Sequence, residues 1–239
     1  MKSISIQWTE EVSLAEARAV LSGVSDAVEL GLALSAKLGV GLVRPEIRPF
    51  GTWRIPSIKK GSPYWSTLWY VHESLDRMSG YIDGRKFLDT IRQEPWQEAG
   101  AHYDIAIVHH NLTDDSDKMV QDGDIQYSLS STSEDLAAVI STKQIRTVND
   151  DRQRREALTR LAVHSFGHVL QTTNRSGPTV RLAYGEKHCT NAGCVMRHAA
   201  TTAELLALSS DEADSEEWFC NECSEAMLRH LLRNHFSVN

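Results

Sequence analysis

The sequence predicts a single α+β domain: a mixed sheet, one long helix that carries chemistry, and a small C-terminal part held by metal. Three observations predict this. Helical spacing of apolar residues alternates with short buried strand patterns, two histidines lie four residues apart, and all four cysteines lie within residues 189–223. A chain of 239 residues can bury a sizeable core. We divide it into an N-terminal subdomain of about residues 1–174 and a C-terminal zinc-binding subdomain of about 175–239.

The composition excludes several classes of protein. Hydrophobic residues make up 41% of the chain, charged residues make up 24%, and the net charge is -7, so no basic surface for nucleic acid is expected. No apolar run approaches the roughly 20 residues of a membrane span, and the N-terminus has no signal-peptide core. We therefore expect a cytoplasmic monomer that binds neither nucleic acid nor membrane.

The first element is predicted to be a helix over residues 13–38, where apolar residues recur at helical spacing. Ser13 is its expected N-cap, and Glu16 stands three residues later, as in a capping box. Four prolines follow within residues 44–63, which predicts an irregular connection.

The remaining elements follow the same kinds of pattern. Buried strands are predicted at residues 103–108, which read Tyr-Asp-Ile-Ala-Ile-Val, and at residues 136–140. Further helical patterns occupy residues 67–78, 85–92 and 224–234.

The most informative element is a helix predicted over residues 152–172, with Asn149 or Asp150 as its cap. At 100° per residue, its apolar side chains fill one broad arc, and His164 and His168 lie together outside it. Imidazoles four residues apart on a helix stack and can share one tetrahedral metal ion. The alternative is two unrelated surface or core histidines.

The cysteines form two pairs, Cys189-x4-Cys194 and Cys220-x2-Cys223. Two such pairs separated by about 25 residues are typical of a structural zinc site. In a reducing cytosol, clustered cysteines are metal ligands more often than disulfides. The alternative, four unrelated buried cysteines, does not explain why they lie so close together in the sequence.

The two patterns meet and resemble a known family. The chain carries His164-x3-His168, then Gly185-x2-His188, then Cys189-x4-Cys194-x-Met196, and finally Cys220-x2-Cys223. This arrangement is similar to the archaemetzincins, whose signature is HExxHxxGxxH followed by Cys-x4-Cys-x-Met and a distant Cys-x2-Cys. The resemblance covers roughly residues 80–235, and the first 60 residues match nothing in it.

The resemblance implies a metzincin-type fold: a mixed twisted sheet, an active-site helix and a small C-terminal subdomain stapled by zinc. It implies two zinc ions per chain. His164, His168 and His188 would bind a catalytic-type zinc, with Met196 in a Met-turn beneath it. The four cysteines, Cys189, Cys194, Cys220 and Cys223, would bind a structural zinc. The strand around Ala138 would be the sheet edge along which an extended peptide lies.

The chain departs from the family pattern in two places. Ser165 stands where the family has the glutamate that acts as general base, and a serine hydroxyl does not exchange protons readily near pH 7. Loss of general acid–base catalysis costs roughly 10² to 10⁴ in rate. About 14 residues, 171–184, are also inserted before the Gly185 turn. Glu186 is a conceivable substitute base, but we expect it to be a solvent-facing loop charge. His198 and His230 are expected to flank the cysteine site without ligating.

Three functions remain open. The first is a zinc metallopeptidase that is slow or inactive because the glutamate is absent. The second is a pseudo-peptidase that binds a peptide or protein partner in the old cleft. The third is a module in which only the cysteine zinc remains.

Overall fold

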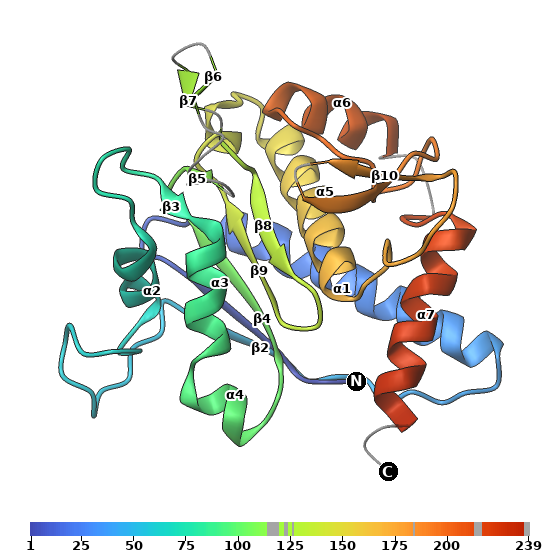
Figure 1. The fold of residues 1–239 in the computed structure, drawn as a ribbon, viewed down its shortest axis with the longest axis horizontal. Helices are drawn as coiled ribbons and strands as arrows, with labels where there is room; N and C mark the ends of the chain where they lie inside the picture. The colour runs from blue at the N-terminus through green and yellow to red at the C-terminus, as the bar shows by residue number, and fades with distance from the viewer. Residues whose placement is uncertain (114–119, 122–123, 126, 184, 213–216, 237–239) are drawn as a thin grey trace.

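The computed structural model describes residues 1–113, 120–121, 124–125, 127–183, 185–212 and 217–236 (Figure 1). Its centre is a five-stranded sheet in the order β2-β1-β4-β9-β8. The first four strands run parallel to one another, and only the last pair, β8 and β9, is antiparallel. The strands are β1 (Ile4–Trp8), β2 (Ile47–Gly51), β4 (Tyr103–Val108), β9 (Ala137–Ser141) and β8 (Ser130–Ser133). The fold is thus mixed α/β with a mostly parallel sheet.

Helices cover both faces of the sheet. On β4, Ile105 and Ile107 pack under α1 (Leu14–Lys37) and α5 (Asp151–Val169). Ala106 and Val108 point the other way, to the core shared with α2 (Thr67–Ser74) and α3 (Gly84–Arg92). This alternation follows from the two-residue period of a strand. Figure 1 shows α1 passing behind the sheet and α3 in front of it.

Helix α1 begins as the sequence predicts. Ser13 Oγ accepts a hydrogen bond from the Glu16 amide at 3.3 Å, and the Glu16 carboxylate accepts one from the Ser13 amide at 2.7 Å. A Cβ at Gly23 would lie 2.4 Å from the Thr159 carbonyl oxygen, so glycine permits the close packing of α1 on α5. By length and composition alone, α1 would also qualify as a membrane span, contrary to the expectation that no apolar run is long enough. Here its apolar side, including Val20, is buried in the core.

The first 60 residues depart from the sequence-based expectation. Strand β1 lies inside the sheet, between β2 and β4, although no strand is predicted there. Its Ile4 and Ile6 alternate with polar residues, which is a strand signal. Strand β2 falls in the segment predicted to be irregular. Because it is an edge strand, Pro49 costs no ladder hydrogen bond to an outer neighbour.

The predicted substrate edge is wrong. Strand β9, which contains Ala138, lies inside the sheet between β4 and β8. The edge is β8, a strand of serine and threonine that turns back antiparallel onto β9 after Asp135, whose φ is 57°. Because β8 contains only serine and threonine, it has no apolar pattern from which a strand could be predicted.

The C-terminal part of the chain packs against α5 and α1. A hairpin of β10 (Val180–Ala183) and β11 (Glu186–Cys189) precedes α6 (Thr202–Glu212) and α7 (Asn221–Phe236). Helix α6 packs against α5, and α7 packs against α1. The shorter elements are β3 (Ile82–Asp83), α4 (Pro95–Ala99), β5 (Leu112–Thr113), β6 (Val120–Gln121), β7 (Asp124–Ile125) and a 3₁₀ turn at Ile145–Thr147.

Candidate metal centres

Helix α5 places His164 and His168 side by side. Asp150 caps the helix, its carboxylate accepting from the amides of Arg152 at 2.8 Å and Gln153 at 3.0 Å. One turn apart, the two imidazole rings have centroids 4.8 Å from each other. Both side chains are buried even though they lie outside the apolar arc of the helix. The C-terminal part covers this side of α5, which the periodicity of the helix alone does not reveal.

The hairpin brings His188 to the same place. Its ring centroid lies 5.4 Å from that of His164 and 4.9 Å from that of His168. The predicted insertion, residues 171–184, contains β10, which pairs with β11 and supports His188; Tyr184 lies outside the described residues. Gly185, with φ 83°, adopts the left-handed conformation at the turn. The insertion therefore builds the hairpin that presents the third histidine.

The three imidazoles are oriented to ligate one ion. Their candidate ligand atoms all lie within 4.8 Å of one another. Each Nδ1 has a neighbour: His164 with the Val195 carbonyl at 2.8 Å, His188 with the Glu186 carbonyl at 3.2 Å, and His168 with Thr173 Oγ1 at 3.4 Å. This pattern leaves the Nε2 atoms for a metal. His168 Nε2 is buried and has no hydrogen bond, so the donor set fits a bound cation.

The pKa values of the three histidines are consistent with metal binding. Burial lowers the pKa of His168 to about 3 and, with a smaller effect from the neighbouring histidines, that of His188 to about 3. Burial also lowers the pKa of His164 well below its ordinary value. The rings are therefore neutral at physiological pH, which is the form that binds metal.

The fully buried Met196 packs against α5 at Gly167, the residue before His168. A Cβ on Gly167 would lie 2.5 Å from Met196 Sδ, so only glycine at this position of α5 lets the sulfur approach the helix so closely. The buried Arg160 donates to the carbonyls of Val195 at 3.2 Å and Arg197 at 3.4 Å, on either side of Met196. Sequence reasoning missed Arg160, because an arginine on an amphipathic helix is normally read as a solvent residue.

Ser165 is buried, and its hydroxyl donates to Ser130 Oγ at 2.9 Å. It thus ties α5 to the edge strand β8. The residue at the position of the family's general base makes a helix-to-strand contact here.

Glu186 is not a solvent-facing loop charge, as expected from the sequence, but a half-buried residue of β11. Its Oε1 accepts from Thr132 Oγ1 of β8 at 2.5 Å, and its Oε2 lies 3.6 Å from His168 Nε2. Burial raises the pKa of this carboxyl. A carboxylate therefore stands beside the histidines, but it comes from the hairpin.

Two other histidines are placed differently from the prediction. The ring of His198 lies 4.6 Å from that of His188, so it belongs beside the histidine cluster. His230 lies on α7, with its Nε2 3.1 Å from the Tyr103 hydroxyl and 3.4 Å from an Asp135 oxygen. In the sequence, His198 stands two residues after Met196, outside the histidine motif. Its place beside His188 follows from the way the chain folds against α5.

The four cysteines form the second cluster. Their sulfurs lie within 4.8 Å of one another, and no disulfide joins them. Cys189 ends β11, Cys220 precedes α7 and Cys223 lies in its first turn. The sulfurs of Cys189 and Cys220 are 3.7 Å apart, close to the ~3.8 Å separation of two thiolates on a tetrahedral zinc. This cluster and the three histidines are both able to hold metal ions.

Hydrogen-bond donors surround the sulfurs. The Asn191 amide lies 3.4 Å from Cys189 Sγ, and Asn191 Nδ2 lies 3.2 Å from Cys220 Sγ. The Arg175 guanidinium lies 3.5 Å from Cys189 Sγ and 3.8 Å from Cys223 Sγ. These donors would offset the negative charge of the thiolates in a metal-bound cluster. The sequence did not point to Arg175, which lies in the predicted insertion.

Neither a model of a known protein family nor a curated protein matches this chain. The likeness to archaemetzincins rests on the spacing of the histidines, the cysteines and Met196.

Proposed function

We propose that the chain is a zinc-dependent peptide hydrolase of archaemetzincin type, in which Glu186 supplies the carboxylate that position 165 lacks. The observation that carries this proposal is the 3.6 Å separation between Glu186 Oε2 and His168 Nε2, in a buried cluster of three neutral imidazoles. The serine at position 165 by itself predicts slow or absent activity. In this proposal Glu186 takes over the role of the missing base.

The division of roles follows from the donor set. A zinc ion held by three imidazoles polarises a carbonyl group and makes water more acidic. Glu186 would accept the proton from the attacking water and return it to the leaving amine, a role worth roughly 10² to 10⁴ in rate. Thr132 holds the carboxylate by its hydrogen bond to Oε1, which leaves Oε2 directed toward the histidine cluster.

The substrate would lie along β8. This strand is the edge of the sheet, and an extended peptide can add to such an edge through main-chain hydrogen bonds. Two of its side chains already touch the candidate site: Ser130 contacts Ser165, and Thr132 contacts Glu186. A peptide paired with β8 would therefore run past the histidines.

Turnover of unstructured peptides by the zinc-loaded protein tests this proposal. We expect chelator-sensitive cleavage that falls by about 10² to 10⁴ in Glu186→Gln at unchanged metal content. Glu225→Gln, which removes an exposed carboxylate on α7, is the matched control and should have no effect. Ser165→Ala should be equally harmless, whereas Ser165→Glu adds a second base and should not lower the rate. Full activity in Glu186→Gln would contradict the assignment.

One observation favours a second function, a peptide-binding module without hydrolysis. Two ligands of a tetrahedral zinc are ~3.4 Å apart, which is close to the 3.6 Å between Glu186 and His168. If Glu186 were a fourth ligand, the coordination would be closed and no position would remain for substrate. Glu186→Gln would then weaken metal binding, and a cobalt-substituted protein would show a four-coordinate spectrum unchanged by peptide.

If only one metal ion per chain is found, the cysteine site alone is functional.

A further inference from the structure

Among the described residues, a third group of metal-ligating side chains lies apart from the two centres. It consists of Glu94, His102 and Asp104, whose candidate ligand atoms lie within 4.8 Å of one another. Glu94 precedes α4, His102 precedes β4, and Asp104 is the second residue of β4. Because side chains alternate along a strand, Asp104 shares a face with Ala106 and Val108, which belong to the core under α2 and α3. The sheet therefore separates this group from the histidines of α5.

The distances between the donor atoms suit a single metal ion. His102 Nε2 lies 3.1 Å from Asp104 Oδ2 and 3.5 Å from Glu94 Oε1. Ligands bonded to one ion at about 2.1 Å lie about 3.0 Å apart in octahedral and about 3.4 Å apart in tetrahedral geometry. The two distances are close to this range, so the three donors already stand near the positions that an ion requires.

Hydrogen bonds orient each of the three donors from behind. His102 Nδ1 lies 2.8 Å from the backbone carbonyl two residues upstream, which leaves Nε2 facing the carboxylates. The Tyr70 hydroxyl donates to Glu94 Oε2 at 2.6 Å, which leaves Oε1 for the cluster. Gln97 Nε2 donates to Asp104 Oδ2 at 2.8 Å. Supporting hydrogen bonds of this kind are typical of metal ligands.

Protons are the alternative occupants of the cluster. The hydrogen bond to Asp104 raises the pKa of His102 to about 10, and burial raises the pKa of Glu94 to about 7. A charged imidazole, one carboxylate and one neutral carboxyl group have no net charge. A divalent ion between two carboxylates and a neutral imidazole has none either. The overall charge therefore does not decide between protons and a metal ion.

The hydrogen-bond geometry favours the ion. Glu94 Oε1 is buried and makes no hydrogen bond. If His102 Nε2 is protonated and donates to Asp104, Oε1 stays without a partner. If instead Glu94 donates from Oε1 to a neutral Nε2, Asp104 Oδ2 lies 3.1 Å from the same nitrogen without a proton between them. Either arrangement leaves a buried polar atom unsatisfied, which is costly, whereas one cation would contact all three donors.

The cluster has an entry path on one side. His102 and Asp104 line a pocket of about 390 Å³, which β1, β2 and α4 surround. The fully buried Glu94 lies behind them. An ion can thus arrive through the pocket, and water from the pocket can complete its coordination. Three protein ligands with one open side are the arrangement of a metal site that exchanges ligands.

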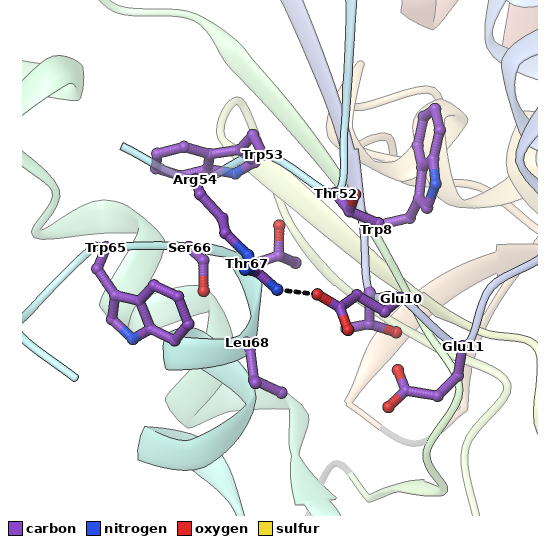
Figure 2. A pocket seen from close by; sticks show the side chains of 11 residues that line it. Trp8, Glu10, Glu11, Thr52, Trp53, Arg54, Trp65, Ser66, Thr67 and Leu68 are labelled. Carbon is purple, nitrogen blue, oxygen red and sulfur yellow. Dashed lines mark hydrogen bonds and ion pairs between the residues drawn. The ribbon is translucent and has the colours of Figure 1, made fainter. Parts of the chain in front are cut away.

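An exposed carboxylate near a smaller cavity shows the contrast. Figure 2 shows Arg54 reaching to Glu10, with which it forms an ion pair. Glu10 is exposed and obtains its cation from the chain itself. Within the part of the chain that the structure describes, the carboxylates of Glu94 and Asp104 have ion-pair contact with His102 alone. The buried cluster therefore lacks the permanent cation that Glu10 has.

We propose that Glu94, His102 and Asp104 bind a divalent transition-metal ion through Oε1, Nε2 and Oδ2. One imidazole and two carboxylates suit Mn²⁺, Fe²⁺ or Zn²⁺, and the group has no thiolate that would select zinc. The ion is additional to those that the cysteine and histidine clusters can hold.

Metal analysis of the full chain after equilibrium dialysis against Zn²⁺ and Mn²⁺ tests the proposal. The native chain should hold one more divalent ion than Asp104→Asn and His102→Gln. Loss of a ligand should weaken binding by at least the roughly 10- to 100-fold that loss of an outer-shell partner costs. The matched controls are Glu98→Gln on α4 and His72→Gln on α2, both exposed, which should keep the ion.

The difference between native chain and variant does not depend on whether the histidine cluster holds zinc. An equal metal count in the native chain and in either cluster variant would overturn the proposal.

A measurement on the native chain decides the case in which a variant fails to fold. The chain is loaded with one zinc ion, which the four thiolates bind, and is titrated with paramagnetic Mn²⁺. Trp53 and Trp96 line the same pocket as His102 and Asp104, so their indole NMR signals should broaden. The methyl group of Met78, which is 97% exposed, reports the effect of free Mn²⁺. Indole signals that broaden no more than that of Met78 would overturn the proposal.

Discussion

The cysteine and histidine clusters are neighbours in sequence but are built differently. The cysteines come from the hairpin, the loop after it and the start of α7, and four thiolates complete the coordination of a zinc ion. Two of the three histidines come from one rigid helix, and a carboxylate stands beside them at 3.6 Å. From this difference we propose that the cysteine cluster stabilises the C-terminal part of the fold, whereas the histidine cluster is the site of the proposed reaction.

A single peptide bond joins the two clusters. His188 and Cys189 are consecutive residues of β11, and successive side chains of a strand point to opposite sides. The strand therefore presents an imidazole to one cluster and a thiol to the other. Cys189 ties the end of β11 to the cysteine cluster. We therefore expect that loss of the metal at the cysteines displaces His188, whereas loss of the metal at the histidines leaves the cysteine cluster intact.

The largest effect is expected from the double variant Cys220→Ser, Cys223→Ser. Structural zinc contributes folding free energy directly, on the order of 10 kcal/mol in small domains. The metal content of the cysteine and histidine clusters should fall from two ions per chain to none, and limited proteolysis should cut within residues 175–239. A variant that keeps one metal ion on the histidines would show that the two clusters are independent.

The next effect comes from His164→Ala. Metal analysis should show the loss of one ion, with the cysteine-bound ion retained, because α5 remains in place without the imidazole. The free energy of unfolding should fall by the linkage free energy of the lost ion, about 4 kcal/mol when free zinc exceeds its dissociation constant a thousandfold, and the thermal midpoint should fall with it. His72→Ala, on α2, is a suitable control. Loss of both ions would reverse the expected direction of dependence.

Gly167→Ala probes the packing between the clusters. The added methyl would lie 2.5 Å from Met196 Sδ and 3.1 Å from Phe219, the residue before Cys220. Overpacking of this kind costs about 1–3 kcal/mol, although alanine is the better helix former. Chemical denaturation measures the loss. Because Met196→Ala removes the clash, the double variant should lose less stability than the sum of the two single variants. An unchanged stability of the single variant would mean that Met196 moves freely.

The smallest effect is expected from Arg175→Met. This change removes the guanidinium beside Cys189 and Cys223 and its 2.9 Å ion pair with Glu222. A charge-assisted hydrogen bond contributes about 1.5–3 kcal/mol, and the half-exposed Glu222 reduces the net loss. We expect faster zinc release to a chelator from the cysteine site only. Equal acceleration at the histidine site would contradict a local role.

The sequence by itself determined the local elements. The capping box of α1, the strand Tyr103–Val108 and the Asp150 cap of α5 are confirmed, because each depends on neighbours within a few residues. The spacing of the cysteines was enough to predict their cluster. The histidine pair on α5 likewise followed from one helical turn.

Only the tertiary structure decided what these elements meet. It placed β1 inside the sheet, made the polar strand β8 its edge, and brought Glu186 to the histidines. It also brought the side chains of Glu94, His102 and Asp104 together. The alternation of Ile4 and Ile6 signals a strand but not its place in the sheet. The other contacts have no periodic signal, because they join side chains that are far apart in the chain or polar residues whose burial depends on what packs over them. The periodicity of a sequence shows which side chains share one face of a helix or strand. A site depends in addition on which of these faces pack against each other, and only the tertiary structure shows that.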